Sequence, residues 1–259
     1  RITQPEADER SYHVFYQLLY GYSEMEEQMF RFDGMRGGQD MKYLSHAGNG
    51  SCYLVAGREE RLELAEVERS IKSLGFSAEE RNGIFKIVAA VQHLGNIQIN
   101  VSEDGERAMV VADDDEPLGD RLQRACSMLG VEAEDLCRAL TTSMLKAGRR
   151  ASVRVKELKK PEALDVRDAL AKELYNALFL WTVERVNQQL LKVPRTEREI
   201  GILDIFGFEI FPINSFEQLC INLTNERLQN NFNRNVFQFE MDLYAREGIK
   251  VDSVKYMDN

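Results

Sequence analysis

Two carboxylates and one glycine follow a short apolar run near residue 200, at a spacing that suits nucleotide chemistry. Residues 199–209 read EIGILDIFGFE, so Asp204 ends the apolar run, and Gly207 and Glu209 follow it. The run is too short for a helix and is typical of a buried parallel strand. In nucleotide-binding sheets, an aspartate at the carboxyl end of such a strand can hold Mg²⁺, and a nearby glycine N–H can meet a phosphate. Taken alone, the pattern also fits an ordinary strand followed by a glycine turn.

A long amphipathic helix is predicted directly after this strand. Asn214 and Ser215 are both good N-cap residues, because each is followed three positions later by Glu or Gln. Apolar residues then recur every three to five positions as far as Gly248, which predicts one helix of about 33 residues, about 50 Å long. Such a helix is either a long core element or a rigid rod that carries a small displacement away from a phosphate-sensing loop.

Composition excludes several classes of protein. The 259 residues carry 33 basic and 43 acidic side chains, and this net charge of −10 argues against a chain that wraps nucleic acid. No apolar run approaches the roughly 18 residues that a membrane helix needs. The four cysteines form no C-x-x-C pair and the three histidines no metal-ligand spacing, so neither a zinc site nor a disulfide framework is indicated. We therefore expect a protein of a reducing compartment, the cytosol.

One stretch departs sharply from this acidic balance. Residues 146–160 hold seven basic side chains against Glu157, a local net charge of +6. A run of this kind is either a solvated loop or a docking site for an acidic partner.

Most of the elements that must position these groups are helices by their apolar periodicity. In chain order, the predicted elements are a helix at 12–20 with Gly21 at its C-cap, loops over 32–57, a helix from 61, a helix from a Ser77 capping box to about 95, a hairpin of 96–100 with 108–112, helices at 118–129 and 133–145, and a long helix from 161 to about 191.

Several blocks of this sequence resemble the myosin motor domain, and they occur in the same order. Residues 204–211 (DIFGFEIF) are similar to the myosin switch II, and residues 214–233 (NSFEQLCINLTNERLQNNFN) to the start of its relay helix. Four further blocks match, namely YHVFYQLLYG at 12–21, IVAAVQHLGNIQI at 87–99, LTTSMLKAG at 140–148 and RDALAKELYNALFLWTVERVN at 167–187. The resemblance covers nearly the whole chain.

The resemblance implies a site for Mg-ATP. Asp204 would belong to the Mg-nucleotide shell and hold the ion through water, and the Gly207 N–H would contact the γ-phosphate. Glu209 would pair with a switch I arginine and help to place the attacking water. Phe232, midway along the long helix, would help to transmit the closure of switch II to the converter.

The resemblance also assigns residues 146–160 to a loop that contacts actin. The actin-binding candidates are Arg149, Arg150, Ser152, Arg154 and Lys156. In the family, the residue sixteen positions before the aspartate of the DALAK block is acidic or phosphorylatable, and here that residue is Ser152. Two arginines shortly before Ser152 provide a context that many kinases accept, so Ser152 is a candidate for regulatory phosphorylation. The alternative is an inert serine in a loop.

The fold class expected is α/β of the P-loop NTPase type, predominantly helical, with one central-sheet strand and a short β-hairpin. The domains expected are the upper 50 kDa subdomain at 1–199, the central strand with switch II at 200–213, and the relay helix with the start of the lower 50 kDa subdomain at 214–259. No G-x-x-x-x-G-K-[ST] motif occurs, so we expect the chain by itself to be inactive as an ATPase.

The function implied is that of an actin-activated Mg-ATPase of the cytoplasm and cytoskeleton that converts nucleotide state into movement. Its partners would be the actin filament, and light chains or calmodulin on a lever outside this chain, with neither nucleic acid nor a membrane span. The alternative is a non-catalytic actin-binding or scaffold protein that kept the myosin fold. A kinesin-like NTPase would not explain the relay-like helix or the block at 167–187.

Overall fold

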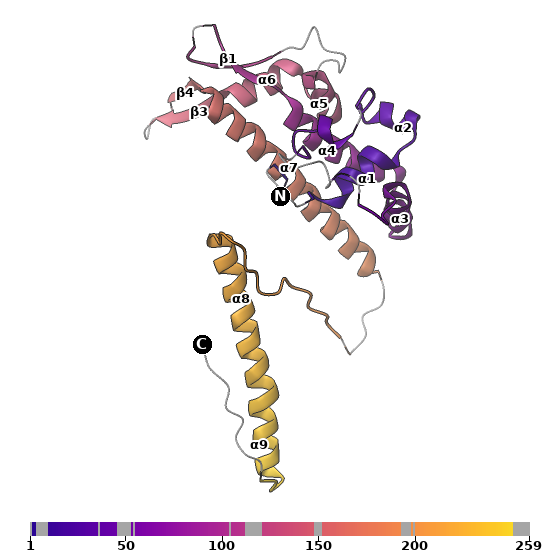
Figure 1. The fold of residues 1–259 in the computed structure, drawn as a ribbon, viewed down its shortest axis with the longest axis vertical. Coiled ribbons are helices and arrows are strands. Elements are labelled where there is room, and N and C mark those ends of the chain that lie inside the picture. Colours follow the sequence, from indigo (N-terminus) through magenta and orange to yellow (C-terminus); the bar gives the residue numbers. More distant parts are fainter. Residues whose placement is uncertain are drawn as a thin grey trace. The chain divides into compact units, whose positions relative to one another are not determined.

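A computed structural model describes residues 2–3, 10–35, 37–45, 53, 55–103, 105–111, 121–147, 152–192, 198 and 200–250 (Figure 1). The chain divides into two compact units, Arg1–Arg195 and Thr196–Asn259, and each is described by itself. Among the described residues, no helix is both long enough and apolar enough to cross a bilayer.

The first unit is mainly helical, as the periodicity predicts. Its helices are α1 (His13–Gly21), α2 (Glu24–Met29), the 3₁₀ turn η1 (Gly38–Asp40), α3 (Glu60–Ser73), α4 (Ala78–Asn96), α5 (Arg121–Leu129), α6 (Ala133–Thr141) and α7 (Lys160–Leu190). Helix α2 was not predicted, although Ser23 and Glu26 form a capping box at its start.

Helix α4 lies at the centre of this unit, packed against α5 and α7 (Figure 1). The predicted capping box is confirmed, because the Ser77 hydroxyl accepts from the Glu80 N–H at 3.1 Å and the Glu80 carboxylate accepts from the Ser77 N–H at 2.7 Å. The last two turns of α4 are buried from Val88 to Gly95, so this part of the helix lies in the core of the unit.

Gly21 has a different role from the one predicted. It is the last residue of α1, its φ is not positive, and Tyr22 is the C-cap. A Cβ at this position would lie 2.8 Å from Leu64 Cδ2 and 3.2 Å from the Glu60 carbonyl oxygen. The glycine therefore permits the close approach of α1 and α3, and does not supply a left-handed cap.

Two antiparallel hairpins complete the first unit. The predicted hairpin is confirmed as β1 (Ile99–Val101) paired with β2 (Ala108–Val110). The second hairpin, β3 (Thr142–Ala147) with β4 (Ser152–Glu157), pairs Thr142 with Glu157 at its base and Ala147 with Ser152 near its tip.

The second hairpin corrects two predictions, a helix as far as residue 145 and a loop over 146–160. Helix α6 ends at Thr141, where the hydroxyls of Thr141 and Thr142 donate to the carbonyls of Cys137 and Arg138 at 2.8 Å and 2.7 Å. These bonds give hydrogen-bond partners to two backbone carbonyls in the last turns of the helix. Thr142 is β-branched, and such residues favour strands. Residues 152–157 supply the pairing partner, which apolar periodicity within one segment cannot reveal.

The second unit is built on one long helical rod. Helix α8 (Phe216–Asn233) continues through the π-helical turn η2 (Arg234–Gln238) into α9 (Phe239–Arg246). The predicted long helix is confirmed, and Gly248 ends it at φ +73°, with the Ile249 N–H bonded to the Tyr244 carbonyl at 2.9 Å. The π turn was not predicted.

The central-sheet strand predicted within residues 200–213 is not observed. Residues 200–211 lie outside any helix or strand, and none of the described residues pairs with them in a ladder. A strand is stable only with a hydrogen-bonded neighbour, so an apolar run alone does not form one. Their side chains, with the exception of Glu209, are accordingly exposed, with Ile200 at 96% and Ile202 at 94%.

Candidate functional site

The segment that carries Asp204, Gly207 and Glu209 lies within the second unit, directly before α8. Asp204 and Gly207 are exposed and Glu209 is partly buried. A Cβ built on Gly207 meets no described atom within 4 Å, and the φ of Gly207 is not positive. Among the described residues, therefore, neither a crowded neighbour nor a left-handed backbone conformation requires glycine at this position.

Asparagine side chains bind the backbone of this segment to α8. The Glu209 N–H donates to Asn222 Oδ1 at 2.8 Å, and Asn222 Nδ2 donates to the Glu209 carbonyl at 2.8 Å. One turn further along the helix, Asn225 Nδ2 donates to the Gly207 carbonyl at 3.0 Å. Asn222 and Asn225 lie three positions apart, which places them on one face of the helix. The backbone around both candidate catalytic residues is thus fixed to the helix.

A third asparagine turns the chain from the segment into the helix. The Phe211 N–H donates to Asn214 Oδ1 at 2.9 Å, and Asn214 Nδ2 donates to the Phe211 carbonyl at 2.8 Å. Ser215 is the N-cap, in a capping box with Gln218, so the second of the two predicted caps is used. Asn214 has the different role of closing the turn before it.

An open groove of about 540 Å³ lies between the segment and the helix. Its lining residues are Asp204, Ile205, Phe206, Cys220, Ile221, Thr224 and Asn225. Asp204 is the only carboxylate among these residues, so the groove combines a mainly apolar wall with one negative charge. Its volume is that of a small-molecule site.

The carboxylate of Asp204 offers oxygen atoms of the kind that a magnesium ion prefers. Mg²⁺ prefers six oxygen ligands in an octahedron and usually keeps several waters. Among the described residues, no cluster of three or more His, Cys, Asp or Glu side chains could hold a metal ion. Asp204 therefore fits one position in a water-rich shell, and the other ligands would have to come from a nucleotide or from groups beyond the described residues.

Phe232 lies at the junction of α8 with the π turn. Its side chain is 55% exposed within this unit, and Arg234, the first residue of the π turn, is two positions further on. A π turn adds one residue to the hydrogen-bonded ring and interrupts the regular ladder, so it is a natural place for a long helix to bend. The predicted relay residue thus borders the least regular part of the rod.

Three of the five residues predicted to contact actin, Ser152, Arg154 and Lys156, belong to strand β4. Arg149 and Arg150 lie outside the described residues. Of Ser152 and Arg154, only the backbone is described. Lys156 is exposed, and its Nζ pairs with Glu162 Oε1 of α7 at 2.6 Å.

The base of this hairpin is joined to the rest of the first unit through Leu158. The Leu158 N–H donates to the Thr141 carbonyl at 2.8 Å, and the Leu158 carbonyl accepts from the Ala108 N–H of β2 at 2.8 Å. Arg107 and Glu157 form an exposed ion pair at 3.2 Å between the two hairpins. The Leu158 side chain is buried, so the strand base is anchored while the strands extend beyond it.

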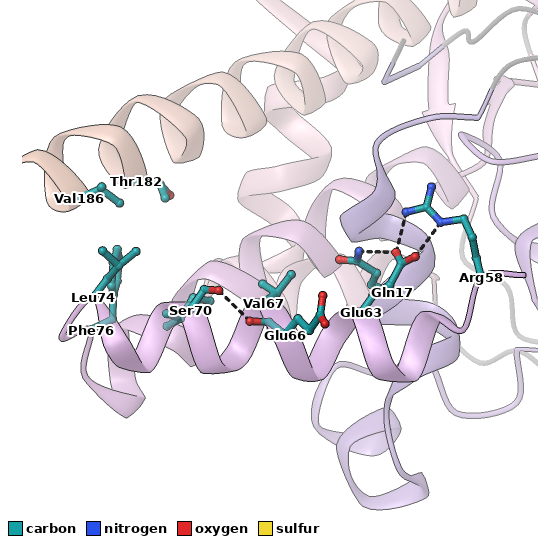
Figure 2. A pocket seen from close by; sticks show the side chains of 11 residues that line it. Gln17, Arg58, Glu63, Glu66, Val67, Ser70, Leu74, Phe76, Thr182 and Val186 are labelled. Carbon is teal, nitrogen blue, oxygen red and sulfur yellow. Dashed lines mark hydrogen bonds and ion pairs between the residues drawn. The ribbon is translucent and has the colours of Figure 1, made fainter. Parts of the chain in front are cut away.

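Helices α3 and α7 border a second hollow, of about 520 Å³, which contains none of the predicted site residues (Figure 2). At one end, the Arg58 guanidinium donates two bonds of 2.7 Å to the Glu63 carboxylate, and Gln17 Nε2 donates a third of 3.1 Å. These donors, the Arg58 hydrogen bond first, lower the pKa of Glu63 to about 2. Glu63 therefore stays ionised at neutral pH and cannot serve there as a general base of ordinary strength.

Sequence reasoning missed the asparagines that hold the segment. Asn222 and Asn225 lie in a block of mixed polar and apolar residues that was interpreted through its apolar positions alone. The signal that could have found them is the i, i+3 spacing of two amides on the helix that follows a glycine-containing segment. Amides both donate and accept, and so can bind an unpaired backbone.

The sequence profile of the myosin head (motor domain) family matches residues 1–259. The chain is 39% identical over 259 residues to Myosin-1 of Sclerotinia sclerotiorum, in an alignment that covers all of this chain and 20% of the relative. It is 37% identical over 264 residues to unconventional myosin-Vc of Homo sapiens, covering 14% of that protein. It is also 37% identical over 268 residues to the myosin IB heavy chain of Dictyostelium discoideum, covering 23%. The chain thus spans between one seventh and one quarter of the length of these relatives.

Proposed function

Because the chain belongs to the myosin motor-domain family, we propose that it forms part of an actin-based motor, a Mg-ATPase that couples ATP hydrolysis to movement. The observation that carries this proposal is the attachment of residues 207–209 to helix α8 through Asn222 and Asn225. A change at the nucleotide-facing segment then changes the position of a long rigid helix. Such a connection is of use to a protein that converts a local chemical event into a larger displacement.

Three residues of the segment take the chemical roles in this proposal. Asp204 holds the magnesium ion through water, and the Gly207 N–H donates to the γ-phosphate. Glu209 pairs with an arginine of switch I and places the attacking water. When bound, Mg-ATP supplies the transferable phosphoryl group, and the ion neutralises its charge. The segment contributes positioning and electrostatic stabilisation, which are the main sources of catalysis in phosphoryl transfer.

The rod α8–η2–α9 acts as the relay in this proposal. The asparagine contacts lie in its first three turns, and Phe232 and the π turn lie further along. A displacement that enters at Asn222 and Asn225 reaches Phe232 through the continuous backbone ladder of α8. The irregular turn after Phe232 would allow the remainder of the rod to change direction.

The β3–β4 hairpin provides the actin-binding surface in this proposal, with Arg149, Arg150, Ser152, Arg154 and Lys156 as contacts. Its anchored base and extending strands suit a docking element. Phosphorylation of Ser152 would add close to two negative charges at neutral pH, and we infer that it regulates the contact with actin.

The remaining features of the proposal concern the whole protein. We propose a cytoplasmic, cytoskeletal location, with light chains or calmodulin bound to a lever outside this chain. The upper 50 kDa subdomain would comprise residues 1–199, switch II residues 200–213, and the relay helix with the start of the lower 50 kDa subdomain residues 214–259. In this division, the chain by itself does not hydrolyse ATP.

The experiment that tests the function compares the complete protein with the isolated chain. Steady-state phosphate release is measured with and without actin filaments, and filament gliding is measured on a surface coated with the protein. We expect actin to accelerate phosphate release from the complete protein and not from the isolated chain. Actin binding without ATP turnover or gliding would favour the alternative of a non-catalytic scaffold.

A further inference from the structure

A polar hollow of about 550 Å³ lies where several elements of the first unit meet, and its lining includes none of the residues of the proposed nucleotide site. It is formed by η1 and the turn after it, the end of α4, strand β1, the first turn of α5 and the first three turns of α7. Its lining includes Lys42, Asn96, Asn100, Arg121, Lys160 and Arg167. Lys160 is the last residue of the basic segment 146–160, but none of these residues is among the named candidates for nucleotide or actin contact.

The lining carries an excess of positive charge. Lys42, Arg121, Lys160 and Arg167 line the hollow together with a single carboxylate, Asp40, among the described residues. The whole chain has a net charge of −10, so a concentration of cations on separate elements is unusual for it. A hollow lined by charges of one sign favours a ligand of the opposite sign.

Arg167 gives the hollow a buried charged wall. Its side chain is only 4% exposed, and Nε and Nη2 donate to Asp168 Oδ1 at 2.9 Å and 2.7 Å. Nη1 donates to the Ile97 carbonyl at 3.1 Å. These bonds use three of the five N–H groups of a guanidinium and fix its plane, and the Tyr43 hydroxyl makes a further hydrogen bond with it. The guanidinium therefore contributes a positive charge in a fixed position to the wall of the hollow.

The wall that carries Lys42 is also held in place. Asn96 Nδ2 donates to the Asp40 carbonyl at 2.8 Å, and Asn96 Oδ1 accepts from the Lys42 N–H at 2.8 Å. The Tyr43 hydroxyl donates to Asp168 Oδ1 at 2.7 Å, beside Arg167. The backbone at Lys42 and the guanidinium of Arg167 are therefore parts of one hydrogen-bonded network, and a ligand would not have to order them.

We propose that this hollow binds a phosphate-bearing ligand, either a free phosphorylated small molecule or the phosphorylated headgroup of a lipid. Phosphate oxygens accept charge-assisted hydrogen bonds from Lys and Arg, and Arg in addition offers a fixed planar fork. The volume lies in the range of small-molecule sites. The Asn96 amide is already bonded to the backbone of Asp40 and Lys42 and to the sulfur of Met41. Lys42, Lys160 and Arg167 therefore make the principal contacts, with Arg121 at the first turn of α5.

The test measures binding of inositol hexakisphosphate to the complete protein by titration calorimetry, with Mg-ADP present in excess to fill the nucleotide site. The variant is the double charge reversal Lys42→Glu with Lys160→Glu, which leaves the buried Arg167 in place. The matched control reverses two exposed lysines away from the hollow, Lys86→Glu with Lys192→Glu, and changes the net charge equally. Circular dichroism and the basal ATPase rate show whether each variant is folded.

We expect saturable binding that the Lys42/Lys160 variant weakens at least tenfold and the Lys86/Lys192 control changes less than twofold. Equal weakening by both variants would reveal a general charge effect and overturn the proposal, as would the absence of saturable binding to the folded wild-type protein. A second arm uses phosphatidylcholine vesicles with and without a phosphoinositide. Phosphoinositide-dependent vesicle binding that is lost in the Lys42/Lys160 variant alone identifies a lipid headgroup, and calorimetric binding without it identifies a soluble ligand.

Discussion

Asn222 and Glu209 exchange two hydrogen bonds of 2.8 Å, one in each direction, between a side-chain amide and a backbone peptide group. The two residues are thirteen positions apart. Asn222 lies on a helix, and Glu209 lies on a segment outside any helix or strand. A backbone that belongs to no sheet has free N–H and C=O groups, and the amide satisfies both at once. The helix and the segment therefore move together at this point.

The first prediction concerns this pair. Asn222→Ala removes both bonds, each worth about 1 kcal/mol, so the segment should separate from the helix. We expect filament gliding to slow at least fivefold while basal phosphate release changes less than twofold. Gln229→Ala is the control, because the Gln229 amide bonds to Asn233 within the same helix. Equal slowing by the two variants would show that the amide acts only through helix stability.

The second prediction concerns the segment itself. Gly207→Ala adds a methyl group that meets no described atom within 4 Å. We therefore expect its effect to arise at the bound nucleotide and not from a clash among the described residues. Glu209→Ala removes the proposed partner of the switch I arginine. Steady-state phosphate release by the complete protein should fall at least tenfold in either variant, about 1.4 kcal/mol of barrier. Near-normal turnover in both would remove this segment from the mechanism.

The third prediction concerns Phe232, whose side chain is 55% exposed beside the π turn. A half-exposed ring contributes less to stability than the roughly 3 kcal/mol of a buried one, so Phe232→Ala should leave the unfolding temperature nearly unchanged. We expect gliding velocity to fall more than basal ATP hydrolysis, because the ring lies between the asparagine contacts and the rest of the rod. If gliding velocity and ATP hydrolysis fell by the same factor in a side-by-side comparison, Phe232 would only stabilise the fold and would not transmit movement.

The fourth prediction concerns Ser152 in the basic hairpin. Actin is acidic, so simple repulsion would make a phosphate here unfavourable, but charge-assisted bonds to neighbouring arginines can order the hairpin at short range. We expect Ser152→Glu to retain actin activation of the ATPase and Ser152→Ala to reduce it, measured at two salt concentrations. Indistinguishable activation curves, or stronger activation by the alanine variant, would end the hypothesis.

The fifth prediction concerns the contact of α1 with α3. Gly21→Ala places a methyl group 2.8 Å from Leu64 Cδ2 and should destabilise the chain by about 1–3 kcal/mol through overpacking. Gly83→Ala is the control, since a Cβ at this helical position meets nothing within 4 Å and should stabilise by about 0.5–1 kcal/mol. Thermal unfolding midpoints that shift in the same direction for both variants would contradict the packing argument.

The sequence by itself determined the elements whose causes are local. The Ser77 capping box, the apolar stripe of α4 and the Gly248 stop each depend on residues within a few positions of one another, and the structure confirms all three. The family is also readable from sequence, because several ordered blocks match at once. The residue roles at Asp204, Gly207 and Glu209 stay predictions.

Tertiary structure alone decided the features that depend on a distant partner. The β3–β4 hairpin forms only because two separate segments pair. Glycine is needed at position 21 because a side chain of another helix lies close to it. The apolar run before Asp204 forms no strand, because none of the described residues pairs with it. The two bonds between Asn222 and Glu209 are of the same kind. Periodicity records which face of an element is apolar, whereas a hydrogen bond or a close approach depends on where another element lies.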